Sequence, residues 1–201
     1  MKRTAITLAL LAVAATGLFA EKFVPATGSM IAIEGTSTLH AWKMEGTTIN
    51  GQISVAPAIA KALNADAWKA AGDEVAAVAV TIPVTSIKSE HDKMDRLMAD
   101  ALKAKANPEI RYQMTSATLQ EAAGATFVLK TTGKLTIAGV TRDLAMTVGG
   151  TRTGDGRYVL AGQAPIKMTE FGIKPPKAMM NTIRTGDDVK VTFRWVVAAT
   201  N

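Results

Sequence analysis

The two histidines are the side chains of this sequence best suited to acid–base or metal chemistry. His40 lies in an alternating, strand-like stretch two residues before Trp42, so its ring is either a hydrogen-bonded structural group or a general base. His91 and Asp95 are four residues apart, a spacing that places both on one face of a helix, where they could bind one metal ion. Two ligands do not complete a metal site and the sequence marks no third, so we predict no metal site.

Other motifs that carry chemistry are missing from the sequence. The chain has no cysteine, which excludes thiol catalysis, zinc–thiolate sites, iron–sulfur clusters and disulfide bonds. It contains no Gly-x-Ser-x-Gly nucleophile motif, and no glycine-rich loop opens a helix after a strand to bind phosphate. The sequence therefore predicts no catalytic residues, no cofactor and no enzymatic activity.

Residues 1–20 have the pattern of a secretory signal peptide. Lys2 and Arg3 precede an uncharged apolar run over 5–20, which ends in small residues. This run is shorter than the ~20 residues that a membrane-spanning helix needs. We expect export to the periplasm, or secretion, with cleavage after Ala20 or alternatively after Ala15. The remaining length fits a single domain over 21–201.

The basic character of the chain, a formal net charge of +6, raises the question of a nucleic-acid partner. Nucleic-acid surfaces cluster Lys and Arg and interleave them with aromatic residues. Here the basic residues are scattered, and aromatic residues make up only 5% of the chain. We therefore predict no nucleic-acid partner and keep, as the functional interpretation of the charge, a transient attraction to anionic headgroups at a membrane surface.

Most of the chain after residue 20 alternates apolar and polar residues with a period of two, which predicts half-buried antiparallel strands. In the clearest case, 188–197, every odd position from 189 to 197 is apolar. About eight such strands with short connections favour a mainly β fold, an eight-stranded antiparallel lipocalin-like barrel, because closure removes exposed edge strands. The expected strands cover 28–38, 39–55, 77–84, 110–115, 125–137, 143–148, 157–169 and 188–197.

Two segments have helical periodicity and predict inserted helices. Residues 57–71 begin with a proline and have an alanine-rich interior. Residues 89–105 predict a second helix, with Ser89 as its N-cap and Asp92 in the capping-box position. Its apolar stripe must pack on the outside of the barrel or close one of its ends, and comprises Met94, Leu97, Met98, Ala101 and Leu102.

Several short motifs follow one another along the chain after residue 20. They include Thr38-Leu39-His40-Ala41-Trp42 and Phe171-Gly172-Ile173, and the full set covers 38–42, 80–89, 93–98, 101–104, 107–110, 133–141, 171–173 and 186–189. As an ordered set they resemble the YceI-like family of exported, lipocalin-like proteins. The resemblance implies an eight-stranded barrel with a helical insertion and an elongated apolar cavity. It also implies a polyisoprenoid or similar long amphiphile as the ligand.

The residues themselves leave open whether the barrel is filled or hollow. Adaptable methionines and an irregular late loop suit a cavity for an apolar chain, but ordinary core packing would use the same side chains. With the resemblance, we predict ligand-binding roles for Trp42, Met94, Leu97, Met98, Leu102, Tyr112, Met114, Phe171, Ile173 and Met179. The candidate polar residues at the cavity mouth are His40, Lys88 and His91.

The resulting hypothesis is a periplasmic carrier that sequesters an isoprenoid or fatty-acid-like lipid in the barrel, as a monomer or a homodimer. Two alternatives belong to other functional classes. One is a hydrolase or isomerase that acts on such a lipid with His40 or His91 as general base. The other is a stress-related interaction module without a fixed ligand. A ligand released unchanged would favour the carrier, whereas a fully packed barrel would favour the interaction module.

Overall fold

The computed structural model describes residues 21–55, 77–178, 180 and 182–200. The expected signal peptide over 1–20, the expected helix over 57–71 and the candidate residue Met179 therefore lie outside the described residues. The strands are β1 (Glu21–Pro25), β2 (Met30–Ser37), β3 (Ala41–Gly46), β4 (Asn50–Val55), β5 (Ala77–Pro83), β6 (Glu109–Ala123), β7 (Thr126–Ile137), β8 (Val140–Arg152), β9 (Tyr158–Lys167), β10 (Lys177–Ala178) and β11 (Ile183–Ala199). Within the described ranges, the helical elements are η2 (Val84–Ser86), α2 (Asp92–Ala101) and η3 (Met168–Phe171).

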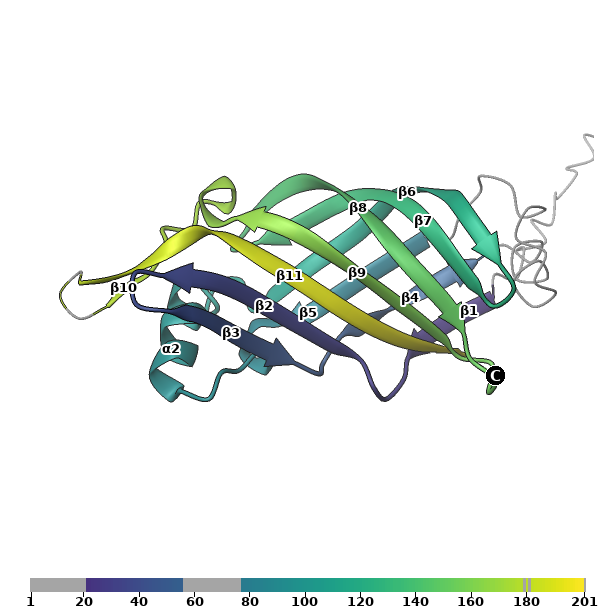
Figure 1. Cartoon of the computed structure of the whole chain (residues 1–201), viewed down its shortest axis with the longest axis horizontal. Coiled ribbons are helices and arrows are strands. Elements are labelled where there is room, and N and C mark those ends of the chain that lie inside the picture. Colours follow the sequence, from purple (N-terminus) through teal and green to yellow (C-terminus); the bar gives the residue numbers. More distant parts are fainter. Residues whose placement is uncertain (1–20, 56–76, 179, 181, 201) are drawn as a thin grey trace, which may run out of the picture.

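Eight of the strands close into a barrel (Figure 1). The order of neighbours runs from β1 through β4, β5, β6, β7, β8 and β9 to β11, and β1 also pairs with β11, which closes the ring. Every pairing in this ring is antiparallel. The prediction of a mainly β fold built on an eight-stranded antiparallel barrel is confirmed.

The first strands of the barrel are interrupted, and the cause lies at Ser29. This side chain is buried, and its Oγ accepts a hydrogen bond from the Val196 N–H at 3.0 Å, while the Ala26 N–H donates to the Val196 carbonyl at 2.8 Å. Both backbone groups of Val196 thus form hydrogen bonds with the segment between β1 and β2. On the two sides of this break, β1 pairs with β4 and β2 pairs with β3. The segment opposite β1 and β2 is therefore also divided into two strands, β3 and β4. The prediction of one continuous strand over 39–55 is therefore wrong.

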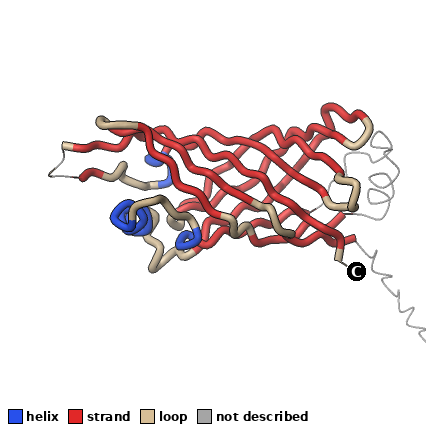
Figure 2. Tube along the Cα trace, turned by 60° about the horizontal axis from the view of Figure 1, so that its bottom comes forward, coloured by secondary structure: helices blue, strands red, loops and turns tan. Residues whose placement is uncertain are grey.

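The helix α2 lies at one end of the barrel (Figures 1 and 2). β3 is the last strand of the sheet at this end, and Glu45 and Lys88 exchange backbone hydrogen bonds, both at 2.7 Å. α2 begins shortly after Lys88, so it continues the wall beside β3. Within the described ranges, no helix is long and apolar enough to cross a membrane.

The helix is shorter than the predicted 89–105. It starts after His91, which is the N-cap residue but makes no capping bond with its side chain. It stops at Ala101 because Lys103 takes a positive φ of 53° and the Ala104 N–H donates to the Ala99 carbonyl at 2.9 Å, a left-handed helix end.

The end of the barrel opposite α2 is filled by the barrel's own side chains, and we call it the packed end. Phe23, Val55, Phe127, Tyr158 and Val197 are all buried there. The rings of Phe23 and Tyr158 meet edge to face, with centroids 5.4 Å apart and an interplanar angle of 88°, a favourable aromatic geometry. β1 and the C-terminus lie at this end, far from α2 (Figure 1).

Candidate functional site

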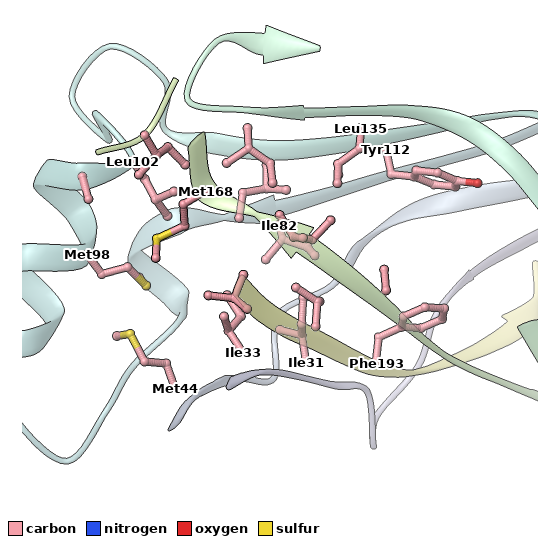
Figure 3. Close-up of a pocket in the computed structure, with 18 of the residues that line it drawn as sticks. Ile31, Ile33, Met44, Ile82, Met98, Leu102, Tyr112, Leu135, Met168 and Phe193 are labelled. Carbon is pink, nitrogen blue, oxygen red and sulfur yellow. The ribbon is translucent and has the colours of Figure 1, made fainter. Parts of the chain in front are cut away.

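A cavity of about 690 Å³ lies inside the barrel, a size within the usual range for small-molecule sites (Figure 3). We call it the channel. Its wall consists mainly of apolar side chains that face inward at alternate positions of the strands, as the period of two requires. Representative lining residues are Ile31, Ile33, Met44, Val80, Ile82, Leu129, Leu135, Leu144, Leu160, Val191 and Phe193.

The channel is long and narrow. Leu129 and Ile137, both in its lining, are eight residues apart on β7, which is about 26 Å along the strand. Allowing for a strand tilt of roughly 40°, the lining extends about 20 Å along the barrel axis. A volume of 690 Å³ spread over this length suits an extended chain better than a compact molecule.

Inward-facing glycines keep the channel open because they let aromatic rings lie against the barrel wall. A Cβ atom at Gly133 would lie 2.5 Å from the ring of Tyr112, and one at Gly162 would lie 2.8 Å from the ring of Phe193. Trp42 covers Gly35 in the same way. Any larger residue at these glycines would push the ring away from the wall. An isolated glycine within a strand pattern signals such a close approach, and our reading of the sequence missed it.

The deep part of the channel offers polar groups but no charge. The Thr131 hydroxyl donates to the Met146 carbonyl at 3.1 Å. The Tyr112 hydroxyl and the Trp195 indole N–H are buried and have no hydrogen-bond partner of good geometry in the described part of the chain. Burial raises the pKa of Tyr112, and the Thr131 hydroxyl opposes this rise only in part. The phenol is therefore neutral over the physiological pH range.

The exposed residues of the lining are His40, His91 and Lys93, and all three lie at the α2 end. We call this the open end. His40 belongs to the tight turn between β2 and β3, where Ser37 Oγ accepts from the His40 N–H at 3.2 Å, and the His40 Nδ1 lies 2.7 Å from the Ala41 carbonyl oxygen. Histidine and lysine side chains therefore border the channel only at its mouth, while its depth is uncharged.

The apolar stripe of α2 faces the channel instead of packing on the outside of the barrel. Met94, Leu97, Met98, Ala101 and Leu102 all belong to the lining. Figure 3 shows Met98 directed into the channel toward Met44 and Met168. Leu102 is buried, whereas the other stripe residues are only half-buried. The helix thus forms part of the wall at the open end.

Asp95 fixes the segment that leads into α2. Its Oδ1 accepts from the Ser89 N–H at 2.7 Å and from the Ser89 hydroxyl at 2.8 Å, and Lys88 Nζ lies 3.5 Å from Oδ2. The Ser89 N–H, and then the Ser89 hydroxyl and Lys88, lower the pKa of this carboxyl against a smaller opposing effect of burial. The predicted capping box with Asp92 is therefore wrong, since Asp95 takes that role toward Ser89.

The geometry also bears on the metal hypothesis. Asp95 is the carboxylate that could have shared a metal ion with His91, but its oxygens are engaged by Ser89 and Lys88. Among the residues that the structure describes, no three His, Asp or Glu side chains are placed to hold a metal ion.

The predicted site residues are distributed as follows. Those that line the channel are Trp42, Met94, Leu97, Met98, Leu102, Tyr112, Met114 and Ile173, with His40 and His91 at its mouth. Phe171 lies in the core with 2% of its surface exposed and does not line the channel, and Lys88 is held near Asp95. Met179 lies outside the described residues. Contact of any of these side chains with a ligand stays a prediction.

Solved structures with the same architecture include three bacterial proteins. The Burkholderia cenocepacia protein BcnA is 19% identical, with a TM-score of 0.61, and the match covers 84% of this chain and 95% of that one. A polyisoprenoid binding domain from Saccharophagus degradans is 14% identical, with a TM-score of 0.63, over 89% and 98% of the two chains. The YCEI protein of Campylobacter jejuni is 22% identical, with a TM-score of 0.54, over 79% and 84%.

No curated protein matches this chain, but a family model does. The model of the YceI-like domain matches residues 24–197, which includes every strand of the barrel at least in part. The chain therefore belongs to the YceI-like family.

Proposed function

We propose that this protein sequesters or carries a long-chain amphiphile, isoprenoid or fatty-acid-like, after export to the periplasm. The hydrocarbon chain would lie in the channel and the polar head at the open end. The observation that carries this proposal is the channel itself, which is narrow, uncharged and mainly apolar along its depth, and bordered by His40, His91 and Lys93 only at its mouth.

Binding of this kind needs no covalent chemistry. Moving one CH₂ group from water into an apolar site is favourable by about 0.8 kcal/mol. Ten buried CH₂ groups would contribute roughly 8 kcal/mol before the cost of ordering the chain is subtracted. The half-buried side chains of Met94 and Met98 suit this task, because methionine adapts to irregular apolar surfaces.

Family membership and the N-terminal sequence support the two finer parts of the proposal. The similar domain from Saccharophagus degradans is a polyisoprenoid binding domain, which favours an isoprenoid as the lipid. The basic and then apolar pattern of residues 1–20 favours export, because it is typical of a secretory signal peptide.

Native mass spectrometry of the protein recovered from the periplasm tests both parts. We expect a chain that has lost residues 1–20, or 1–15, and carries one lipid, which extraction releases chemically unchanged. A membrane-embedded chain that retains Met1 would contradict export. Purified protein without lipid, which also fails to bind added polyprenol or fatty acid, would contradict the carrier.

Two histidine variants distinguish a carrier from an enzyme. His40→Ala and His91→Ala should each leave lipid affinity within about tenfold, an effect of ~1.4 kcal/mol. Lipid turnover by the parent protein that disappears in either variant would establish a hydrolase or isomerase instead.

A further inference from the structure

We propose that the open end is a docking surface for anionic phospholipid bilayers. Two neighbouring turns would make this surface, the one between β2 and β3 with Leu39 and the one between β10 and β11 with Met180. The inference rests on the proposed function, since it provides a route by which a lipid passes between the channel and a membrane.

Each turn presents an apolar side chain to solvent. Leu39 is 66% exposed and Met180 is 99% exposed, the two highest values among the large hydrophobic residues that the structure describes. The other large exposed hydrophobics, Val24 and Met30, are 37% and 43% exposed and lie on β1 and β2. Exposed apolar side chains at the tips of projecting turns are suited to insertion between lipid headgroups.

Hydrogen bonds join the two turns into one surface. The Thr38 N–H donates to the Arg184 carbonyl at 2.9 Å, and the Arg184 N–H donates to Thr38 Oγ1 at 3.2 Å. The Thr38 hydroxyl also donates to the Thr182 carbonyl at 3.2 Å. β10 and the start of β11 project beyond the barrel beside the turn between β2 and β3 (Figure 1).

The charge of this surface matches an anionic membrane. Residues 171–186 contain Lys174, Lys177 and Arg184 but no Asp or Glu. Lys174 and Lys177 are exposed, and neither forms an ion pair with a described residue. Lys167 and Lys190 on the barrel wall differ from them, since these two pair with Asp188 and Glu34. Cations held near an anionic leaflet strengthen membrane binding.

The surface is continuous with the channel mouth. Ser37 ends β2 just before the first turn, Pro176 directly precedes β10, and Ile183 and Thr185 lie at the start of β11. All four line the channel. A molecule docked through Leu39 and Met180 would therefore present its mouth to the membrane. α2 does not belong to this surface, because Asp92, Asp95 and Asp100 outnumber its basic residues.

Co-sedimentation with phospholipid vesicles tests the proposal. We would use vesicles of phosphatidylcholine alone and vesicles with about 30% phosphatidylglycerol, an anionic lipid. The charge variant is Lys174→Glu with Lys177→Glu, matched by Lys22→Glu with Lys130→Glu on β1 and β7. The apolar variant is Leu39→Ser with Met180→Ser, matched by Val24→Ser with Met30→Ser. Denaturant midpoints verify that all four variants remain folded.

We expect the parent protein and both control variants to bind the anionic vesicles, and each test variant to bind at least about tenfold more weakly. Equal losses in test and control variants would overturn the proposal, as would equal binding to both kinds of vesicle. If Leu39→Ser with Met180→Ser dissociates a dimer and leaves vesicle binding unchanged, the surface joins two copies of this chain and the membrane proposal is wrong. Failure of the carrier function would appear separately, as a protein that binds no lipid in native mass spectrometry.

Discussion

The two ends of this barrel use the same strands for different purposes. At the packed end, the side chains of Phe23, Phe127, Tyr158 and Val197 meet one another and fill the interior. At the open end, β3 and α2 form the wall, and the channel reaches the solvent beside His40 and His91. The backbone hydrogen bonds close the barrel, but the inward-facing side chains determine whether its interior is filled or hollow.

Glycine under an aromatic ring occurs in both regions, and its consequence differs with the surroundings. Phe127 lies over Gly150 in the packed end, where the ring is buried among core side chains. Phe193 lies over Gly162 in the channel, where the ring is only half-buried. The first ring does not line the channel, whereas the second does. The contact of an aromatic ring with a glycine therefore belongs to the core at the packed end and sets the width of the channel at the other.

The largest expected effect is on the packed end. Phe23→Ala removes one ring of the edge-to-face pair with Tyr158 and leaves a cavity, so it should lower the free energy of unfolding by about 3–5 kcal/mol. Denaturant titration measures this loss, and lipid affinity of the folded fraction should stay within about threefold. A loss of lipid affinity by tenfold or more in the folded fraction would show that the two ends are not independent.

A methyl group placed beneath the ring of Phe193 should weaken both lipid binding and stability. Gly162→Ala puts a Cβ 2.8 Å from the ring of Phe193, which must turn into the channel and narrow it. We expect lipid affinity to fall by roughly tenfold or more and the unfolding free energy by about 1–3 kcal/mol. Gly149→Ala is the matched control, because its Cβ would meet only the Ala161 carbonyl oxygen at 3.9 Å. Equal lipid affinity in the two variants would refute the role of the ring.

Truncation of the helix stripe should weaken binding without a matching loss of stability. Leu97→Ala and Met98→Ala each remove apolar contact with a ligand chain, at most about 2–3 kcal/mol of binding free energy. Both side chains are half-buried, so the denaturant midpoint should change less than the affinity. Arg96→Ala, on the exposed face of α2, is the control. Unchanged affinity with a large loss of stability would make α2 structural packing only.

The smallest expected effect concerns Tyr112 and appears only in alkali. Burial raises the pKa of its phenol in the folded state. Above the unfolded pKa of about 10, the unfolded chain loses this proton first, so stability falls as the pH rises further. Tyr112→Phe should match the parent protein near pH 8 and be more stable near pH 11, by denaturant midpoint, both pH values being approximate. A parallel pH dependence of the two proteins would contradict the assignment.

The alternation of apolar and polar residues was sufficient to predict the barrel. Its period of two marked strands such as β11, where Val189, Val191, Phe193, Trp195 and Val197 all face inward. It could not predict the break at Ser29, because that break depends on hydrogen bonds with Val196, 167 residues away. The end of α2 at Ala101 was also missed, since a positive φ at Lys103 has no clear sequence signal.

The candidate site divides in the same way. The helical spacing of Met94, Leu97, Met98, Ala101 and Leu102 determined that they share one face, because 3.6 residues make a turn. Whether this face packs outside or borders a channel was decided by tertiary structure, through the backbone pairing of Glu45 with Lys88 that sets α2 beside β3. Likewise, the sequence determined which strand residues face inward. Only the closed barrel showed that the aromatic side chains lying over Gly133 and Gly162 leave a channel. The space between opposite barrel walls depends on contacts among strands that are distant in the sequence.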